Sequence, residues 1–132
     1  MFQIERHFIE DMLTHAKAED PNECCGLIAG KDGRVARVFR ATNSERSPVR
    51  YNVEPKELLH IDKEIESKGW ELVSIYHSHT HSEAYPSATD VRLAFWPGAT
   101  YLIISLQDKD NPVVRAFKIE DGVISEEQLQ IV

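Results

Sequence analysis

The sequence predicts an α/β or α+β domain in which helices flank a mixed β-sheet. The chain has 132 residues, which is the usual size of one domain, so residues 1–132 are expected to form a single unit. Hydrophobic residues make up 42% of the chain, a value typical of a globular protein with a real core. Segments with strand character outnumber segments with helical periodicity, and the two kinds are mixed along the chain.

Helices are predicted from apolar spacing and from start and stop signals. In the first, apolar side chains recur at the i, i+3, i+4 and i+7 positions beginning at Ile9, and Asp20-Pro21-Asn22 supplies the stop. In the second, Pro55 is a start signal and Gly69 a stop signal. The expected helices are Ile9–Glu19, Pro55–Lys68 and Ser87–Phe95.

Strands are predicted where apolar residues run between turn signals without a helical period. The segment Cys24–Gly30 is small and apolar, and its glycines allow close backbone approach. Lys31-Asp32-Gly33 is typical of a hairpin turn into the next strand. The expected strands are Cys24–Gly30, Arg34–Thr42, Tyr51–Val53, Trp70–His79, Thr100–Gln107, Val113–Ile119 and a last segment from Asp121-Gly122 towards Val132.

Charge and composition argue against several classes of function. The net charge is −7 and no Lys/Arg run is present, so a nucleic-acid partner is not expected. The charged N-terminal segment lacks the apolar core of a signal peptide, and no apolar run has the length of a membrane span. A cytoplasmic protein that does not associate with membranes is therefore expected.

The two cysteines, Cys24 and Cys25, are adjacent and have no distant partner, so no disulfide framework is predicted. They are expected to be small, buried, reduced thiols beside Gly26. A nucleophilic cysteine is the less favoured alternative, because nothing else in the sequence requires one.

The segment Tyr76–Asp90 holds the residues with the strongest chemical signal. If Trp70–His79 is a strand, His77 and His79 project from the same face, with Cα atoms about 6.5–7 Å apart. That spacing lets two imidazoles bind one metal ion, and Asp90 can supply a third ligand. Two histidines and one carboxylate leave a tetrahedral zinc one open position, which is the arrangement of catalytic zinc sites. One zinc ion per chain is therefore predicted.

Each part of this pattern also has a purely structural interpretation. A His-x-His pair on a strand is more often a pair of surface or hydrogen-bonded histidines. Ser87-x-x-Asp90 before an apolar helical segment matches a capping box, although such a helix start would also aim Asp90 at the end of the histidine strand. His81 lies two residues after His79 and continues the alternate spacing of the histidines, but it lies beyond the expected end of the strand. It is predicted to be a solvated loop residue, with contact to metal or substrate as the alternative.

A zinc hydrolase also needs a proton acceptor and a donor for the oxyanion. Glu23, at the mouth of the apolar strand, is the best candidate for the carboxylate that takes a proton from water and gives it to the leaving amine. The alternative is an exposed strand end. Ser87 has a hydroxyl next to Asp90 that could stabilise the oxyanion. The alternative is helix capping, and one hydroxyl is not expected to fill both roles equally well at once.

Together, these residues resemble the signature of the JAMM (MPN+) metalloproteases, in which a distant Glu precedes His-x-His-x7-Ser-x2-Asp. Glu23–Leu27 also resembles the first core strand of that family. The resemblance implies a curved β-sheet with helices on either side, as in the cytidine deaminase architecture. One departure is Thr80, where many members have proline, and it leaves the rigidity of the following loop in question. The resemblance implies zinc ligation by His77, His79 and Asp90, general base and acid catalysis by Glu23, and stabilisation of the tetrahedral intermediate by Ser87.

Loop residues narrow the resemblance to the bacterial CysO-cysteine peptidases. Asn43–Pro48, together with Tyr76–Thr80 and Glu83–Ser87, resembles that subgroup. The subgroup implies hydrolysis of the amide bond at the C-terminal Gly-Gly of a ubiquitin-like sulfur carrier, with release of cysteine or a short C-terminal extension. The alternative interpretation of Asn43–Pro48 is a surface loop with no special role.

Two other functions are open at this point. One is a different zinc amidohydrolase or isopeptidase of the same fold, and the other is a non-catalytic MPN scaffold, which the presence of all five site residues disfavours. The sequence does not distinguish a monomer from a homodimer, and it identifies neither the carrier, the leaving group nor the pathway. No substrate-binding residue is assigned, but the loops Asn43–Pro48 and Thr80–Pro86 are candidate walls of a narrow groove for a Gly-Gly tail.

Overall fold

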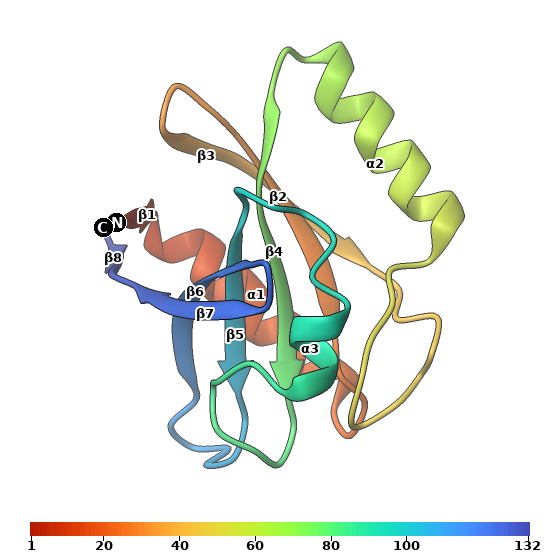
Figure 1. The fold of residues 1–132 in the computed structure, drawn as a ribbon, viewed down its shortest axis with the longest axis vertical. Coiled ribbons are helices and arrows are strands. Elements are labelled where there is room, and N and C mark those ends of the chain that lie inside the picture. The colour runs from red at the N-terminus through yellow and green to blue at the C-terminus, as the bar shows by residue number, and fades with distance from the viewer.

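A six-stranded sheet forms the centre of the computed structural model, which describes all residues, 1–132 (Figure 1). Its strand order is β3-β2-β4-β5-β6-β7. Strands β4 and β5 are parallel and every other neighbouring pair is antiparallel, so the sheet is mixed, as predicted. The strands are β2 (Cys25–Lys31), β3 (Arg34–Ala41), β4 (Glu71–His79), β5 (Thr100–Ser105), β6 (Val113–Glu120) and β7 (Val123–Glu127).

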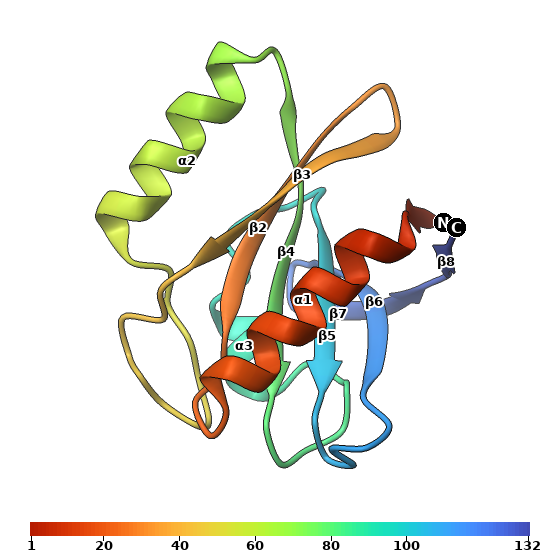
Figure 2. The same cartoon turned by 180° about the vertical axis from the view of Figure 1, so that it is seen from behind.

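Helices cover both faces of this sheet, which also agrees with the prediction. Helix α1 (Arg6–Glu19) crosses one face, as Figure 2 shows, and α3 (Ala88–Arg92) lies over the other (Figure 1). Successive side chains of a strand point to opposite faces. In β2, Ile28 accordingly packs with α1, whereas Leu27 packs with α2 (Pro55–Ser67) on the face that α3 shares. None of the helices has both the length and the apolar character needed to span a membrane.

Close packing joins α1 to the strand that carries the two histidines. Tyr76 of β4 is fully buried on the α1 face, and its hydroxyl lies 2.7 Å from Nδ1 of His15. A Cβ atom at Gly26 would overlap the Tyr76 ring, so only glycine fits at this position of β2. The predicted close backbone approach is found at Gly30, where a Cβ atom would lie 2.6 Å from the carbonyl oxygen of Arg34, whereas a side chain approaches Gly26.

Several predicted boundaries differ from those in the structure. The expected strand Tyr51–Val53 is only a single β-bridge between Asn43 and Val53. The side-chain oxygen of Asn43 accepts the Asn52 N–H, so a side chain holds this segment in place of a ladder of backbone hydrogen bonds. The last helix ends at Arg92, and the segment up to Phe95 is not helical. The first helix begins at Arg6, one turn earlier than its apolar period indicates.

The two ends of the chain pair with each other. The final segment divides after Glu127, and β8 (Leu129–Ile131) leaves the main sheet to pair in parallel with β1 (Phe2–Ile4). The termini therefore lie side by side in both views (Figures 1 and 2). The sequence did not predict β1, because a strand of three residues is too short to show a period.

Candidate metal centre and active site

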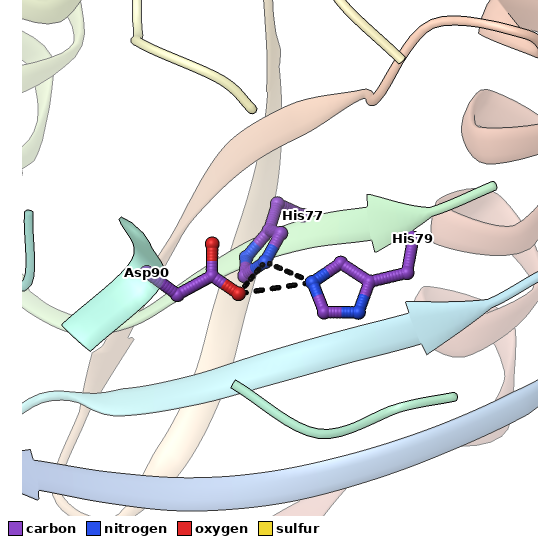
Figure 3. A group of neighbouring side chains, drawn as sticks. All are labelled: His77, His79 and Asp90. Atoms are coloured by element: carbon purple, nitrogen blue, oxygen red, sulfur yellow. Dashed lines mark hydrogen bonds and ion pairs between the residues drawn. The ribbon is translucent and has the colours of Figure 1, made fainter. Parts of the chain in front are cut away.

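The end of β4 and the start of α3 bring three metal-ligating side chains together (Figure 3). His77 and His79 lie on the α2 and α3 face of the sheet, and Asp90 projects from the first turn of α3. The three offer ligand atoms within 4.8 Å of one another, and all three side chains are buried. Oδ2 of Asp90 lies 3.1 Å from Nε2 of His77 and 2.9 Å from Nε2 of His79. The predicted grouping of these residues is therefore present.

The hydrogen bonds around His79 fit a cation at the centre of this group. Nδ1 of His79 lies 2.8 Å from the backbone carbonyl of Glu83, which can only accept, so Nδ1 carries the proton. In neutral His79, Nε2 then turns a lone pair towards Asp90, and it also lies 3.2 Å from Nε2 of His77. The lone pairs of His79 Nε2 and Asp90 Oδ2 repel each other when no proton lies between them, and a bound cation would remove that conflict. A backbone carbonyl that holds the second ring nitrogen is also the usual support of a metal-binding histidine.

Protonation of the group is set by burial and by mutual contact. Burial acts to raise the pKa of Asp90, but the two histidines and the Ser87 N–H outweigh it and hold that pKa below its usual range. Burial lowers the pKa of His77 despite the nearby carboxylate, which favours the neutral imidazole that binds metals. Burial also acts to lower the pKa of His79, but hydrogen bonds to Asp90 and Glu83 raise it, so a proton competes for the Nε2 lone pair.

An aromatic side chain that sequence reasoning missed orients His77. The ring of Tyr51 stacks on the imidazole with centroids 4.4 Å apart and planes 21° from parallel. Nδ1 of His77 is buried and has no hydrogen-bond partner in the protein. The His77 ring is therefore held by stacking on Tyr51 and by the contact of Nε2 with Asp90. Nothing in the sequence around Tyr51 signals the stacking contact.

Ser87 and Asp90 form a capping box at the start of α3, as the structural interpretation predicted. The Ser87 hydroxyl oxygen accepts the Asp90 N–H at 3.0 Å, and Oδ2 of Asp90 accepts the Ser87 N–H at 2.9 Å. The cap uses a lone pair of the Ser87 oxygen, and the hydroxyl hydrogen stays free to donate. The cap therefore leaves the hydroxyl hydrogen available for a second contact, and the expectation that one hydroxyl does not fill both roles equally well at once stays a prediction.

Replacing Ser87 by alanine separates these roles. Loss of the cap is expected to lower the free energy of unfolding by about 1 kcal/mol. Loss of an oxyanion donor is expected to reduce kcat by about 10²–10³ with zinc content unchanged. Thermal unfolding, zinc analysis and turnover are measured on the same variant. A loss of stability with normal kcat would show that Ser87 only caps the helix.

Glu23 is buried just before β2, with 3% of its surface exposed, so the alternative of an exposed strand end is wrong. Its Oε1 atom is buried and has no hydrogen-bond partner. The pKa of Glu23 is raised to about 8, chiefly by burial, with His79 acting to lower it and Asp90 acting to raise it. The charge of a bound cation would act in the same direction as His79. A carboxyl group poised in this way can both accept and return a proton near neutral pH.

Asn43 holds the loop Asn43–Pro48 against Glu23. Its side-chain amide donates to the carbonyls of Glu23 and Arg50, and its oxygen accepts from the N–H groups of Glu45 and Asn52, all at 3.0 Å. The Glu23 N–H in turn donates to the carbonyl of Ser47 at 2.8 Å. The loop therefore holds both the backbone N–H and the backbone carbonyl of Glu23. The alternative of a surface loop with no special role is wrong.

Thr80 restrains the second loop in place of the proline that many family members have. Thr80 is buried, and its hydroxyl donates to the carbonyl of Pro48 at 3.3 Å. His81 is exposed, as predicted, and lies outside the metal-ligating group. The two loops meet at an open depression of about 450 Å³, called the histidine depression. It is lined by Glu23, Pro48, Val49, His79, His81, Ser82 and Ser87.

The two cysteines have the structural role that was expected. Both are buried and free of disulfide bonds. Burial raises the pKa of the Cys24 thiol to about 12, so its nucleophilic thiolate form is disfavoured at neutral pH. Neither cysteine lines the histidine depression.

Comparison with known proteins agrees with this geometry. A family described as prokaryotic homologs of the JAB domain matches residues 5–120. The chain belongs to this family. A JAB relative from Mycobacterium tuberculosis, named CysO-cysteine peptidase, is 40% identical over 131 residues, which cover 98% of this chain and 90% of the relative. The predicted resemblance to JAMM proteins is thereby confirmed.

This JAB protein also resembles a second named protein in sequence and a solved protein in structure. A Haloferax volcanii protein named desampylase is 41% identical over 103 residues, or 73% of this chain and 74% of the relative. The solution structure of a Desulfitobacterium hafniense protein superposes with a TM-score of 0.90 at 38% identity, covering 100% of this chain and 93% of the other. The chain therefore shares the fold of that solved protein over its whole length.

Proposed function

We propose that this JAB protein is a zinc-dependent peptidase that hydrolyses the amide bond at the C-terminal Gly-Gly of a ubiquitin-like sulfur carrier. The products are the carrier and cysteine or a short C-terminal extension. The observation that carries the proposal is the meeting of Glu23, His79 and Ser87 at one depression, directly beside the buried metal-ligating group. The names CysO-cysteine peptidase and desampylase, given to the relatives above, support the class of substrate.

His77, His79 and Asp90 would hold the zinc ion, which when bound supplies Lewis-acid chemistry to polarise a carbonyl and acidify water. The chain supplies the remaining steps. Glu23 takes a proton from the attacking water and delivers it to the leaving nitrogen, a transfer for which its unpartnered Oε1 is available. Ser87 donates its free hydroxyl hydrogen to the oxygen of the scissile carbonyl as negative charge develops there.

The substrate is expected to reach this site as an extended tail. Loops Asn43–Pro48 and Thr80–Pro86, the predicted groove walls, both contribute residues to the histidine depression. The hydrogen bond from Thr80 to Pro48 ties these walls together and restricts their separation. A Gly-Gly tail has no side chains to clash with walls held in this way. A cytoplasmic location and the choice between a monomer and a homodimer stay predictions.

Mass spectrometry of a carrier–cysteine conjugate, before and after incubation with the zinc-loaded protein, tests the proposal. The expected result is free cysteine and a carrier that ends in Gly-Gly, with no reaction after chelation. Replacing the carrier's Gly-Gly by Val-Val is expected to slow cleavage by at least tenfold, because added side chains meet the groove walls. A conjugate that stays intact would overturn the proposed function. Equal cleavage of both tails would instead point to a broader zinc amidohydrolase.

A further inference from the structure

A second depression adjoins Glu23 and has no role in the steps described above. It measures about 310 Å³ and is lined only by polar or charged residues, so it is called the polar depression. Its lining residues are Glu19, Asn22, Glu23, Thr42, Asn43 and Arg46. Glu23 is the one residue that lines both depressions, whereas His79 and Ser87 line the histidine depression alone. The two depressions therefore meet at the candidate base.

The direction of the substrate follows from this arrangement. The scissile carbonyl must lie beside the metal-ligating group and Ser87, which places the carrier tail in the histidine depression. The leaving nitrogen must lie at Glu23, which returns the proton to it. Whatever is attached to that nitrogen must then continue beyond Glu23, and the polar depression is the other space that Glu23 lines.

We propose that the polar depression is the leaving-group site and that Arg46 binds the free α-carboxylate of the departing residue. This inference rests on the proposed function. Arg46 is the only cation in the lining, and its guanidinium makes neither a salt bridge nor a hydrogen bond within the chain. A guanidinium matches a carboxylate through paired, charge-assisted hydrogen bonds. The site would thus select a substrate whose C-terminal residue follows the scissile bond directly.

The loop backbone and the other lining groups fit this role. Arg46 has a φ of 45°, in the left-handed region that side-chain-bearing residues rarely adopt, and its N–H donates to the Asn43 carbonyl at 3.2 Å. The side-chain amide of Asn43 cannot hydrogen-bond a ligand, because its two N–H groups and its oxygen are already hydrogen-bonded within the chain. The side chains of Asn22 and Thr42 have no such bonds and can add to the contacts of the carboxylate.

The product of the reaction also matches the charges of the depression. Hydrolysis breaks the amide C–N bond, forms a C–O bond to the carrier and adds one proton to the nitrogen through Glu23, which gives an amine. The new carboxylic acid of the carrier loses its proton and the amine gains one, so the released residue carries an ammonium group as well as a carboxylate. The polar depression combines Arg46 with the carboxylates of Glu19 and Glu23, so it complements both charges of a free amino acid.

Two carrier conjugates and three variants test the inference. The conjugates carry cysteine with a free carboxylate or cysteinamide, which lacks that charge. The wild-type protein is expected to cleave the free-acid conjugate about tenfold faster in kcat/KM. Arg46→Gln is expected to lower kcat/KM about three- to tenfold for the acid, chiefly through KM, and to leave the amide unchanged. Arg46→Lys should restore part of the preference, and Arg50→Gln, an exposed arginine outside the lining, should behave as wild type.

The outcomes separate the two proposals. Equal cleavage of the acid and the amide by the wild-type protein would overturn the leaving-group site and leave the peptidase function intact. An Arg46→Gln variant that slows both conjugates alike, with normal zinc content and thermal stability, would also overturn it. If the wild-type protein cleaves neither conjugate, the proposed function fails and the leaving-group site fails with it.

Discussion

Replacing His77 by alanine is expected to remove the metal and the turnover together. The side chain supplies one of three ligand atoms that lie within 4.8 Å of one another, and two ligands do not hold zinc tightly. The measurements are zinc content after dialysis and turnover of the carrier–cysteine conjugate, and both are expected to fall to background. His79→Ala is expected to behave in the same way.

The control for this experiment is His81→Ala. His81 lies two residues beyond His79 on an exposed loop, so its loss is expected to leave the zinc content unchanged. Circular dichroism and thermal unfolding show whether each variant keeps its fold, since His77 is buried against Tyr51 and its removal also leaves a cavity. Normal zinc content in folded His77→Ala and His79→Ala proteins would contradict the ligand assignment.

Replacing Glu23 by glutamine is expected to reduce kcat by about 10²–10⁴ while zinc and fold are retained. Glutamine fills the same buried space, but it cannot accept a proton. Rates are measured by single-turnover cleavage of the carrier–cysteine conjugate, and zinc content is determined on the same preparation. The hydrogen bonds of the Glu23 peptide unit to Asn43 and Ser47 do not involve the changed side chain, so the loop is expected to stay in place.

A matched change at Glu45 tests whether the loss of any nearby carboxylate lowers kcat. Glu45 is exposed on the same loop, and Glu45→Gln is expected to leave kcat unchanged. Near-normal kcat in Glu23→Gln would show that another group accepts the proton. Simultaneous loss of zinc would instead indicate that Glu23 supports the metal site, and the general-base role would then need a different test.

The sequence by itself determined the part of the site whose geometry is local. Strand alternation placed His77 and His79 on one face, and the capping box placed Asp90 in the first turn of the next helix. Both rules act over a few residues, and the three ligands lie within a short stretch of chain. The mixed sheet and the main helices could be predicted for the same reason, because their apolar periods are strong.

Only the tertiary structure decided how distant residues meet that stretch. Glu23 comes near the histidines because β2 pairs with β4 in the register Cys25↔His77. Alternation cannot fix this register, since a slip of two residues keeps the same faces buried. The stacking of Tyr51 on His77 and the four hydrogen bonds of Asn43 likewise depend on how loops close over the sheet. Such contacts have no local period, so they could be seen only once the chain was folded.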